Sequence, residues 1–320
     1  MKDLPILLVQ AWAAVLSNFM ITVTLILTGP RIRLFRTIMK ISSRLPSKSY
    51  QKLSRLIHAK DIIGFHLIGY LLIFIAVKQS NVNNLYIHLV IFQMDMLYMN
   101  CVCVLKECFK ELNDNLANMR EFIAINNKLH VPRLIYYEQK TPFLIMEIKA
   151  LKKQHLTISD TVQMLNSIFS FQLLATIVIT ISILTVCLYF YIIMWQHSLS
   201  TTPINGFFHV YFLSHIAHYF IKIVLIVWAC ETGKNQAQQV GTSIHDAFNS
   251  TTNEQIKDEL QLFSLQILHC NNTFSAKCLT VDAKLLAGIM GSIITYLIIM
   301  FQFISDSCKG KTASNIAEIL

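Results

Sequence analysis

Six runs of apolar residues constrain this fold more than any other feature of the chain. They cover residues 4–28, 62–77, 85–105, 167–195, 207–230 and 283–304. A helix needs about 20 apolar residues to cross the hydrocarbon core of a bilayer. Each run is nearly unbroken, whereas a strand of a membrane barrel alternates between apolar and polar residues over about ten positions. The sequence therefore predicts an all-α, multi-pass transmembrane helical bundle with six spans.

The composition argues against a soluble protein. Apolar types make up 54% of the 320 residues and charged types 14%, whereas roughly a quarter of an ordinary soluble domain is charged. A soluble monomer of this composition would expose large apolar patches and aggregate. The net charge of +9 would also suit a nucleic-acid-binding protein. The basic residues follow the pattern of a membrane topology instead, so we expect no nucleic-acid partner.

The basic residues are distributed unequally between the loops. Nine lie between Arg31 and Lys60, nine between Lys106 and Lys153, and four between Lys234 and Lys284. The segments on the other side of the membrane hold only four in total. Because cytosolic loops carry an excess of Lys and Arg, this pattern places the three larger loops in the cytosol and both termini outside. The first of these loops is also suited to contact anionic lipid. We expect a multi-pass protein of the plasma membrane.

Residues 4–28 also permit a second interpretation, as a signal peptide. Lys2 would form its basic start, but the run is longer than such a peptide requires and a basic flank follows at Arg31. These two features favour a membrane span. Asn249 and Asn271 begin N-glycosylation sequons in a loop that we place in the cytosol, so we expect neither to be glycosylated.

The reactive residues form no pattern that indicates an enzyme. Cys101 and Cys103 lack the spacing of a zinc site, and the eight cysteines are scattered through spans and loops. His215 and His218 share a helix face, but two ligands without a third are weak grounds for a metal site. We therefore expect no catalytic residue, no metal and no cofactor.

Helical periodicity continues into the cytosolic segments. Apolar residues recur every three or four positions at Leu105, Cys108, Leu112, Leu116 and Met119. The spacing predicts that the helix of this span projects below the membrane, and that its neighbour at 167–195 does the same. The sequence Val131-Pro132 interrupts the pattern.

A second apolar stripe follows a plausible N-cap at Asn253. It consists of Ile256, Leu260, Phe263 and Ile267, and is widened by Leu262, Leu265 and Leu268. Two interpretations remain open. The stripe packs against other cytosolic helices of the same chain, or its first four residues form an anchor between subunits.

Charged residues inside two of the spans call for an explanation. Asp95 lies in the middle of the run 85–105, and Lys222 lies in the run 207–230. Ionisable groups within a membrane are costly and usually have a function or a partner. A buried pair of these two side chains is one possibility.

Polar and small residues line one face of the last run. At 3.6 residues per turn, Gly291, Thr295, Ile298 and Gln302 fall on the same side of a helix. Such a face suits the wall of a pore, in which Ile298 would expel water and Gln302 would offer an amide oxygen to a cation. An equally good explanation is that Thr295 and Tyr296 bond to neighbouring helices while Gln302 reaches the membrane surface.

A motif in the same run resembles the signature of the insect gustatory receptors. Thr295 and Tyr296 precede five apolar residues, and Gln302 and Phe303 follow them. The segments Phe263–His269, Phe274–Ala276 and Leu279–Asp282 are also similar to this family. Family members commonly carry Gly where Lys277 or Cys278 stands here, so a hinge in the last helix is expected to differ.

The resemblance implies a ligand-gated cation channel, assembled as a tetramer of identical or related subunits. The last helix of such receptors is split into a cytosolic half that anchors the subunits and a half that lines the pore, with the Gln-Phe pair near the gate. Here these halves would be residues 255–269 and 283–304. The family has seven spans, so the resemblance also implies that a first span is missing from this chain.

The resemblance divides the chain by role. Ligand-binding helices with cytosolic extensions would occupy residues 1–230, a cytosolic loop with the anchor helix 231–282, the pore helix 283–304, and an external tail 305–320. A small-molecule tastant, a bitter compound first and a sugar second, would enter a cavity among the earlier spans. The candidate contacts are His88, Asp95, Tyr191, Trp195, His209, Tyr211 and His215.

A second class of function stays open. A transporter, or a membrane scaffold that does not conduct, could carry the same signature by descent. A G-protein-coupled receptor is less compatible with the pattern, since it needs seven spans and a cytosolic tail.

Overall fold

The computed structural model describes residues 15, 18–78, 82–128, 134–200, 206–277 and 279–317 of the chain. Nearly all of these residues are helical. The helices are α2 (Thr28–Ser42), α3 (Ser47–Lys78), α4 (Val82–Lys128), α5 (Leu134–Ser200), α6 (Gly206–Ser250), α7 (Glu254–His269) and α8 (Ala283–Ala317). Two short strands, β1 (Ser275–Ala276) and β2 (Leu279–Thr280), separate α7 from α8.

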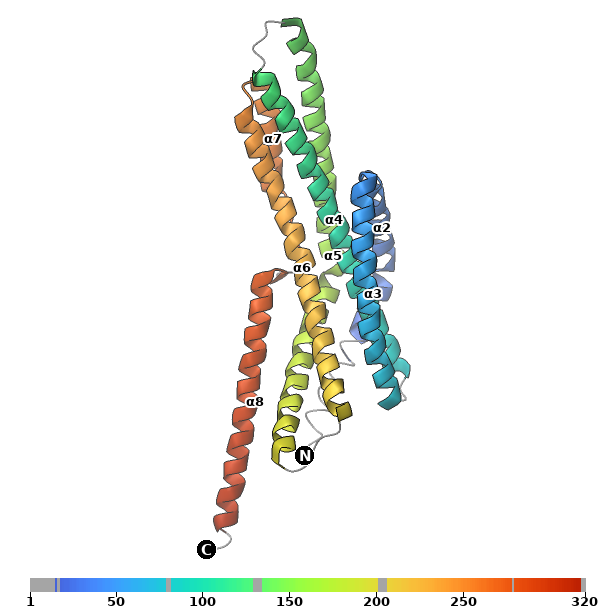
Figure 1. The fold of residues 1–320 in the computed structure, drawn as a ribbon, viewed down its shortest axis with the longest axis vertical. Coiled ribbons are helices and arrows are strands. Elements are labelled where there is room, and N and C mark those ends of the chain that lie inside the picture. The colour runs from blue at the N-terminus through green and yellow to red at the C-terminus, as the bar shows by residue number, and fades with distance from the viewer. Residues whose placement is uncertain are drawn as a thin grey trace.

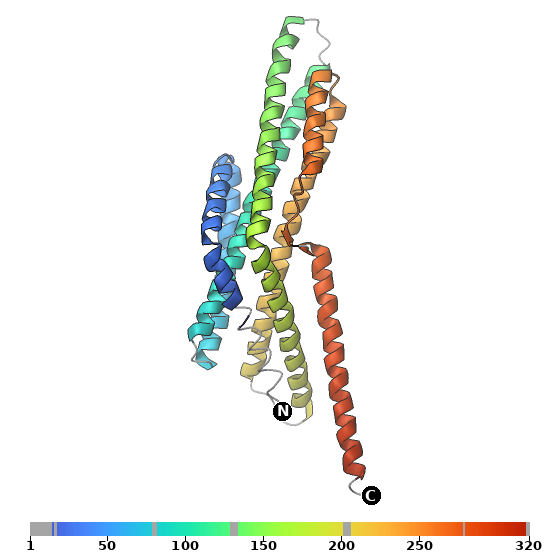
Figure 2. The same cartoon turned by 180° about the vertical axis from the view of Figure 1, so that it is seen from behind.

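Three long helices form the body of the molecule. Figure 1 shows α4, α5 and α6 side by side, with α2 and α3 as a hairpin against one flank. α7 lies beside α5 and α6 at the top of this view. Figure 2 shows from behind that α8 leaves this bundle near its middle and descends at its side. At 1.5 Å per residue, the 67 residues of α5 reach about 100 Å. The hydrocarbon core is about 30 Å thick, so a large part of α5 must lie outside it.

Four helices contain segments that are long and apolar enough to cross a membrane. Within the described residues these segments are His88–Ile123, Thr141–Met194, Phe212–Ser250 and Ala283–Gln302. The run 62–77 forms the second half of α3, and most of the run 4–28 lies outside the described residues. The helical, multi-pass architecture is confirmed, and the count of six spans stays a prediction.

The predicted periodicity of α4 places a continuous apolar stripe in the core. Its members are at most 3% exposed: Leu105, Cys108, Leu112, Leu116 and Met119. These residues pack toward α5 and α6, which contact α4 over much of its length. α4 ends at Lys128 and α5 begins at Leu134, on either side of the predicted interruption. Val131 and Pro132 themselves lie outside the described residues.

Two predicted boundaries do not coincide with helix ends. α6 is one continuous helix from Gly206 to Ser250, so the division of the chain after residue 230 falls in its interior. α8 continues to Ala317, past the expected end of the pore segment at residue 304. In both helices no Pro or Gly cluster follows the apolar run to stop the backbone hydrogen bonding.

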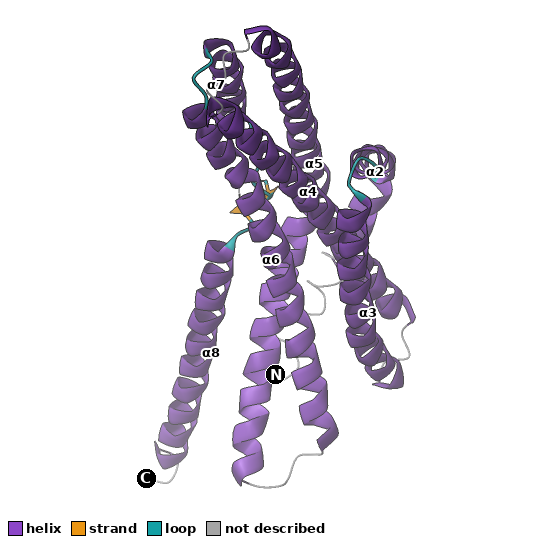
Figure 3. Ribbon diagram, turned by 45° about the horizontal axis from the view of Figure 1, so that its top comes forward, coloured by secondary structure: helices purple, strands orange, loops and turns teal. Residues whose placement is uncertain are grey.

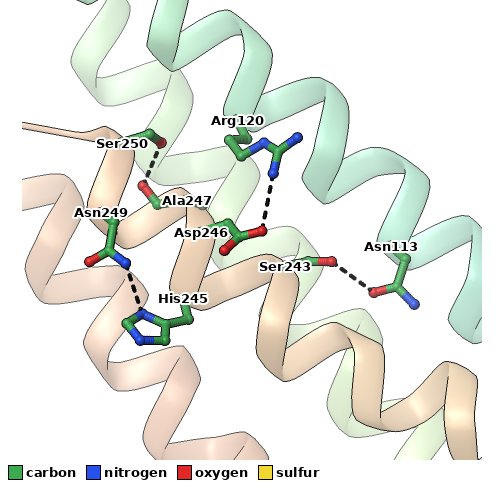
Figure 4. A network of polar contacts seen from close by, with 8 residues as sticks. All are labelled: Asn113, Arg120, Ser243, His245, Asp246, Ala247, Asn249 and Ser250. Atoms are coloured by element: carbon green, nitrogen blue, oxygen red, sulfur yellow. Dashed lines mark hydrogen bonds and ion pairs between the residues drawn. The ribbon is translucent and has the colours of Figure 1, made fainter.

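Polar contacts join α4 and α6 beyond their apolar runs (Figure 4). Arg120 Nη1 lies 3.1 Å from Asp246 Oδ2, and Ser243 Oγ donates to Asn113 Oδ1 at 3.3 Å. Asn113 Nδ2 donates in turn to the carbonyl oxygen of Gln236 at 2.9 Å. An exposed ion pair such as that of Arg120 contributes little stability. We infer that this network mainly fixes the register of the two helices.

The start of α7 agrees with the predicted N-cap. The side-chain oxygen of Asn253 accepts hydrogen bonds from the backbone amides of Gln255 at 3.0 Å and Ile256 at 3.3 Å. Such a cap satisfies amide groups that have no partner in the first turn of a helix.

The burial of α7 corrects the assignment of the anchor. Ile256, Leu260 and Phe263 are at most 5% exposed, because α7 packs against α5 and α6 of the same chain. Ile267 is half-buried. A side chain that its own chain covers is not available to a second subunit, so the first interpretation holds for these three residues. The exposed ridge of α7 consists of Leu262, Leu265 and Leu268, with 49%, 48% and 80% exposure.

Two leucine substitutions in α7 test this division. We expect Leu260→Ala to destabilise the purified chain by about 2–5 kcal/mol, because it leaves a cavity in a packed interior. The matched control Leu262→Ala removes the same atoms from an exposed site and should leave the melting temperature of the monomer nearly unchanged. Thermal unfolding in detergent measures both, and equal losses would contradict the assignment of the two faces.

Candidate pore helix, hinge and buried polar cluster

One face of α8 packs against its own chain. Ile289 and Ile293 are buried, and Leu285, Leu286 and Leu297 are partly buried beside them. These residues recur at helical spacing and face α5 and α6. Near the far end, the rings of Tyr189 on α5 and Phe301 on α8 are 5.9 Å apart.

The face opposite to this packed side carries the residues predicted to line a pore. Gly291, Thr295, Ile298 and Gln302 are all exposed in the single chain, and Ile298 is 53% exposed. At 100° per residue, their mean direction is about 180° from that of Ile289 and Ile293. The Phe303 side chain lies outside the described residues.

Within this chain, the hydroxyl of Thr295 forms its hydrogen bond inside α8 and not with a neighbouring helix. Thr295 Oγ1 donates to the carbonyl oxygen of Gly291 at 2.9 Å, one turn earlier on α8 itself. Tyr296 is 56% exposed on the flank of the helix. Little side-chain volume therefore projects from this face at Gly291 and Thr295. Glycine has no side chain, and the threonine hydroxyl is turned back to the backbone.

A short hairpin lies in the segment between α7 and α8, residues 270–282, which we call the hinge. Figure 3 shows its two strands. Strands β1 and β2 pair antiparallel, with Ser275 opposite Thr280. The amide of Val281 donates to the carbonyl oxygen of Phe274 at 3.0 Å and closes the hairpin. The backbone of the hinge is therefore ordered by its own hydrogen bonds.

Asn166 of α5 holds the entrance of the hinge. Its Nδ2 donates to the carbonyl oxygen of Thr273 at 2.7 Å, and its Oδ1 accepts from the amide of Ser275 at 3.1 Å. One side chain thus satisfies backbone groups on both sides of Phe274. Phe274 itself is 1% exposed and lies against Gly233 of α6.

The turn of the hinge departs from the pattern of the resembled family. Lys277 has a φ of 56°, in the left-handed region, where glycine has no steric cost. A glycine would therefore suit this position, and Lys277 adopts the left-handed conformation at a steric cost. The ammonium of Lys277 lies 3.7 Å from the ring centre of Phe171 on α5. Cys278 lies outside the described residues.

The exit of the hinge is held by charge. Asp282 Oδ1 accepts from the amide of Leu285 at 3.1 Å and caps the start of α8. Lys234 Nζ of α6 lies 3.6 Å from Asp282 Oδ2. The amide of Leu285, and next Lys234, lower the pKa of Asp282 below its usual value. The hinge is therefore fixed to α5 at its entrance and to α6 at its exit.

Asp95 and Lys222 form the predicted pair inside the bundle. Lys222 Nζ on α6 lies 3.3 Å from Asp95 Oδ2 on α4, and the two side chains are 5% and 2% exposed. Thr176 Oγ1 on α5 donates to Asp95 Oδ1 at 2.9 Å. Removing one partner of such a pair would leave an uncompensated charge in a buried site. Together with Thr176, the pair joins all three long helices.

One aromatic ring contacts this pair, and further rings pack beside it. Lys222 Nζ lies 5.0 Å from the ring centre of Tyr219, and the rings of His218 and His215 lie 5.2 Å and 6.3 Å from that of Tyr219. The ring of Phe92 on α4 lies 6.1 Å from that of His218. We call Asp95, Thr176, His215, His218, Tyr219 and Lys222 the buried polar cluster.

The other candidate ligand contacts lie on the same helices. His88 is half-buried and lies seven residues before Asp95, on the same face of α4. The rings of Tyr191 and His209 are 5.8 Å apart, nearer the end of α5 and the start of α6. The side chains of Trp195 and Tyr211 lie outside the described residues. The structure thus brings Asp95 and His215 into one region and Tyr191 and His209 into a second.

Several residues of these sites were missed by sequence reasoning. Thr176 and Tyr219 carry no motif, and Asn166 and Gly233 lie far along the chain from the hinge that they contact. One signal was available for Gly233, because a glycine inside a helical pattern often marks a close approach. Among the described residues, no group of three or more His, Cys, Asp or Glu side chains could hold a metal ion.

Two glycines of α6 provide a test of the hinge contact. A Cβ at Gly233 would lie 2.7 Å from Phe274 Cε2, whereas a Cβ at Gly241 would meet only Ile267 Cγ2, at 3.8 Å. We expect Gly233→Ala to lower the melting temperature and Gly241→Ala to preserve or raise it, since alanine favours a helix by about 0.5–1 kcal/mol. Thermal unfolding in detergent distinguishes the two. A neutral Gly233→Ala would show that Phe274 is not held here.

Comparison with known proteins agrees with this architecture. The chain matches the family described as 7tm Chemosensory receptor over residues 6–306. It is 29% identical over 156 residues to a Drosophila melanogaster protein that carries the name gustatory receptor 28b, covering 48% of this chain and 33% of that protein. For gustatory receptor 28a of the same organism the identity is 30% over 173 residues, covering 52% and 38%. The matched stretches thus span between 33% and 38% of the length of these relatives.

Solved structures show the same fold at low identity. The insect olfactory receptor OR5 from Machilis hrabei superposes with a TM-score of 0.64 and 12% identity, over 91% of this chain and 79% of that one. Its complex with eugenol gives the same TM-score at 13% identity. The family match extends over most of the residues described above, from the first apolar run through the hinge to α8. The chain therefore belongs to the 7tm chemosensory receptor family.

Proposed function

We propose that this chain is a gustatory receptor subunit that forms a tastant-gated, non-selective cation channel in the plasma membrane of a chemosensory neuron. Membership of a chemosensory receptor family supports a receptor rather than an enzyme. The observation that carries the channel is the direction of α8. The face with Gly291, Thr295, Ile298 and Gln302 lies opposite the face that packs on α5 and α6.

In this proposal, six spans cross the membrane and four subunits surround the pore. Each α8 would pack its apolar side on its own subunit and turn its opposite side toward the shared axis. Four copies of Ile298 would form an apolar ring that blocks ions by excluding water. Gln302 would provide amide oxygens for a partly dehydrated cation, and Phe303 would narrow the outer mouth as part of the gate.

The ridge of Leu262, Leu265 and Leu268 on α7 is the part of the chain that we propose as the contact between subunits. It is apolar and exposed, and it lies on the side of α7 opposite to the packed core residues Leu260 and Phe263. An apolar ridge of this kind in water is stabilised by a partner. Either a second copy or a related receptor subunit would supply it.

We propose that the tastant binds among α4, α5 and α6, where the buried polar cluster and the pair Tyr191 and His209 lie. Aromatic walls with a few polar groups suit small organic ligands. A bitter compound is the first candidate class and a sugar the second. The related fold of an olfactory receptor solved with eugenol supports a small-molecule ligand in general terms.

The same helices connect the ligand region to the hinge. α6 carries Lys222 of the cluster and, twelve residues later, Lys234, which contacts Asp282. These two lysines are about 18 Å apart along the helix axis. α5 likewise carries Thr176 of the cluster and Asn166, which holds the hinge backbone. A ligand that shifts α5 against α6 would therefore move the start of α8.

Two isoleucines of α8 test the pore assignment. Ile298 and Ile299 are 53% and 40% exposed, but Ile298 lies on the proposed pore face and Ile299 lies about 100° further around the helix, on the flank. We expect Ile298→Ala to raise the current without tastant several-fold, because a smaller ring admits water more easily. Ile299→Ala should leave that current unchanged. Patch-clamp recording from cells that express only this chain, with surface labelling of each variant, makes the comparison.

The same recording tests the gate and the alternative function. Gln302→Ala should abolish the tastant-evoked cation current, and Phe303→Ala should alter it. Equal currents in the Ile298 and Ile299 variants would contradict the proposed pore face. Strong surface expression without any current, with or without a second receptor subunit and over a broad tastant panel, would favour a transporter or a scaffold that does not conduct.

A further inference from the structure

The α2–α3 hairpin carries an exposed basic surface that neither the pore nor the ligand region uses. Between Arg31 and Lys60 the chain has no acidic residue. Arg31 is itself buried, with its Nη2 2.7 Å from Gln172 Oε1, and Lys60 pairs with Asp61 at 2.6 Å. The remaining bases of the hairpin are all exposed: Arg33, Arg36, Lys40, Arg44, Lys48, Lys52 and Arg55.

The bases of both helices point away from the bundle. On α2, Arg33, Arg36 and Lys40 follow at intervals of three and four residues, which places them on one face. The buried residues Leu34, Ile38 and Ile41 occupy another face of α2, which packs on α4 and α5. By the same spacing, the three bases of α3 share a face that lies away from its buried residue Leu53.

None of these charges is neutralised inside the described part of the chain. No ion pair there involves any of the seven exposed bases. Exposed apolar side chains lie next to the bases at the open end of the hairpin, with Ile32 at 45% beside Arg33 and Leu56 at 42% beside Arg55. Bases interleaved with apolar side chains suit the boundary between lipid headgroups and acyl chains.

We propose that the open end of this hairpin binds anionic lipid headgroups of the cytoplasmic leaflet through Arg33, Arg36 and Arg55. The inference rests on the proposed topology, in which the apolar runs that end at residue 28 and begin at residue 62 enter the membrane. Arg33 and Arg55 are then about 8 Å and 10 Å of helix from the inner surface. This is within about one Debye length at physiological salt, so the charges are not fully screened from the headgroups.

The turn of the hairpin provides a contrast within the same element. Arg44 and Lys48 are about 21–24 Å from the membrane ends of α2 and α3 by the same measure. Beyond two Debye lengths, exposed charges contribute little to the attraction. A lipid surface therefore distinguishes the two ends of the hairpin, whereas a soluble acidic protein would find equal charge at both.

Two triple variants with the same change in charge test the proposal. Arg33→Gln, Arg36→Gln and Arg55→Gln together neutralise the open end, and Lys40→Gln, Arg44→Gln and Lys48→Gln together neutralise the turn. The full chain is purified in neutral detergent and titrated with phosphatidylserine or with phosphatidylcholine of the same acyl chains. Native mass spectrometry counts the bound lipids. Since all six side chains are exposed, unchanged melting temperatures would confirm that both variants fold.

We expect the unmodified chain to prefer phosphatidylserine over phosphatidylcholine, and the open-end variant to bind phosphatidylserine about tenfold more weakly. The turn variant should retain most of the preference. Equal losses in both variants, or no loss in either, would overturn the proposal. Glycosylation of Asn249 and Asn271 in cells reports the topology separately. Modified sequons would refute the cytosolic placement, while the lipid preference in detergent would still be measured.

Discussion

The one-sided packing of α8 is the constraint on which the rest of this structure depends. Backbone groups in lipid must be bonded within the segment, so α8 leaves the bundle as an unbroken helix. Only one of its sides contacts α5 and α6. Its opposite side carries Thr295 and Gln302, and an amide such as that of Gln302 is poorly accommodated by acyl chains. In the proposed channel, a water-filled axis shared with other copies would surround this side of the helix.

The hinge explains how such a helix stays connected to the bundle. Asn166 satisfies backbone groups on both sides of Phe274, and Lys234 contacts the residue that caps α8. These contacts come from the two helices that also hold the buried pair of Asp95 and Lys222. In the proposed function, a rearrangement of α5 against α6 in the ligand region would reach the start of α8 through these contacts.

Sequence reasoning predicted what depends on local pattern and charge. The stripe of Leu105 to Met119 is buried as its spacing requires, and Asn253 caps α7. The cost of isolated charges in a membrane raised a pair of Asp95 and Lys222 as one possibility, which the structure bears out. The partner of an apolar stripe could not be predicted in this way. Ile256, Leu260 and Phe263 have the spacing of an interface, and only the fold reveals that their partner is the same chain.

The hinge contacts were beyond prediction for a different reason. Asn166 lies 107 residues before Thr273, and no periodicity relates the two positions. Lys277 adopts a conformation that its residue type disfavours, so the turn follows from the surrounding hydrogen bonds and not from local preference. Long-range contacts and strained turns depend on the packed bundle, which a single sequence does not reveal.

Cysteine accessibility along α8 tests the central claim most directly. Thr295→Cys and Ile298→Cys lie on the exposed face opposite the bundle, whereas Ile289→Cys and Ile293→Cys lie on the packed face. With tastant present, a charged, water-soluble thiol reagent should change the current of the first two variants and leave the last two unaffected. If Thr295→Cys and Ile298→Cys do not react while the channel conducts, this face is turned toward lipid and the account is wrong.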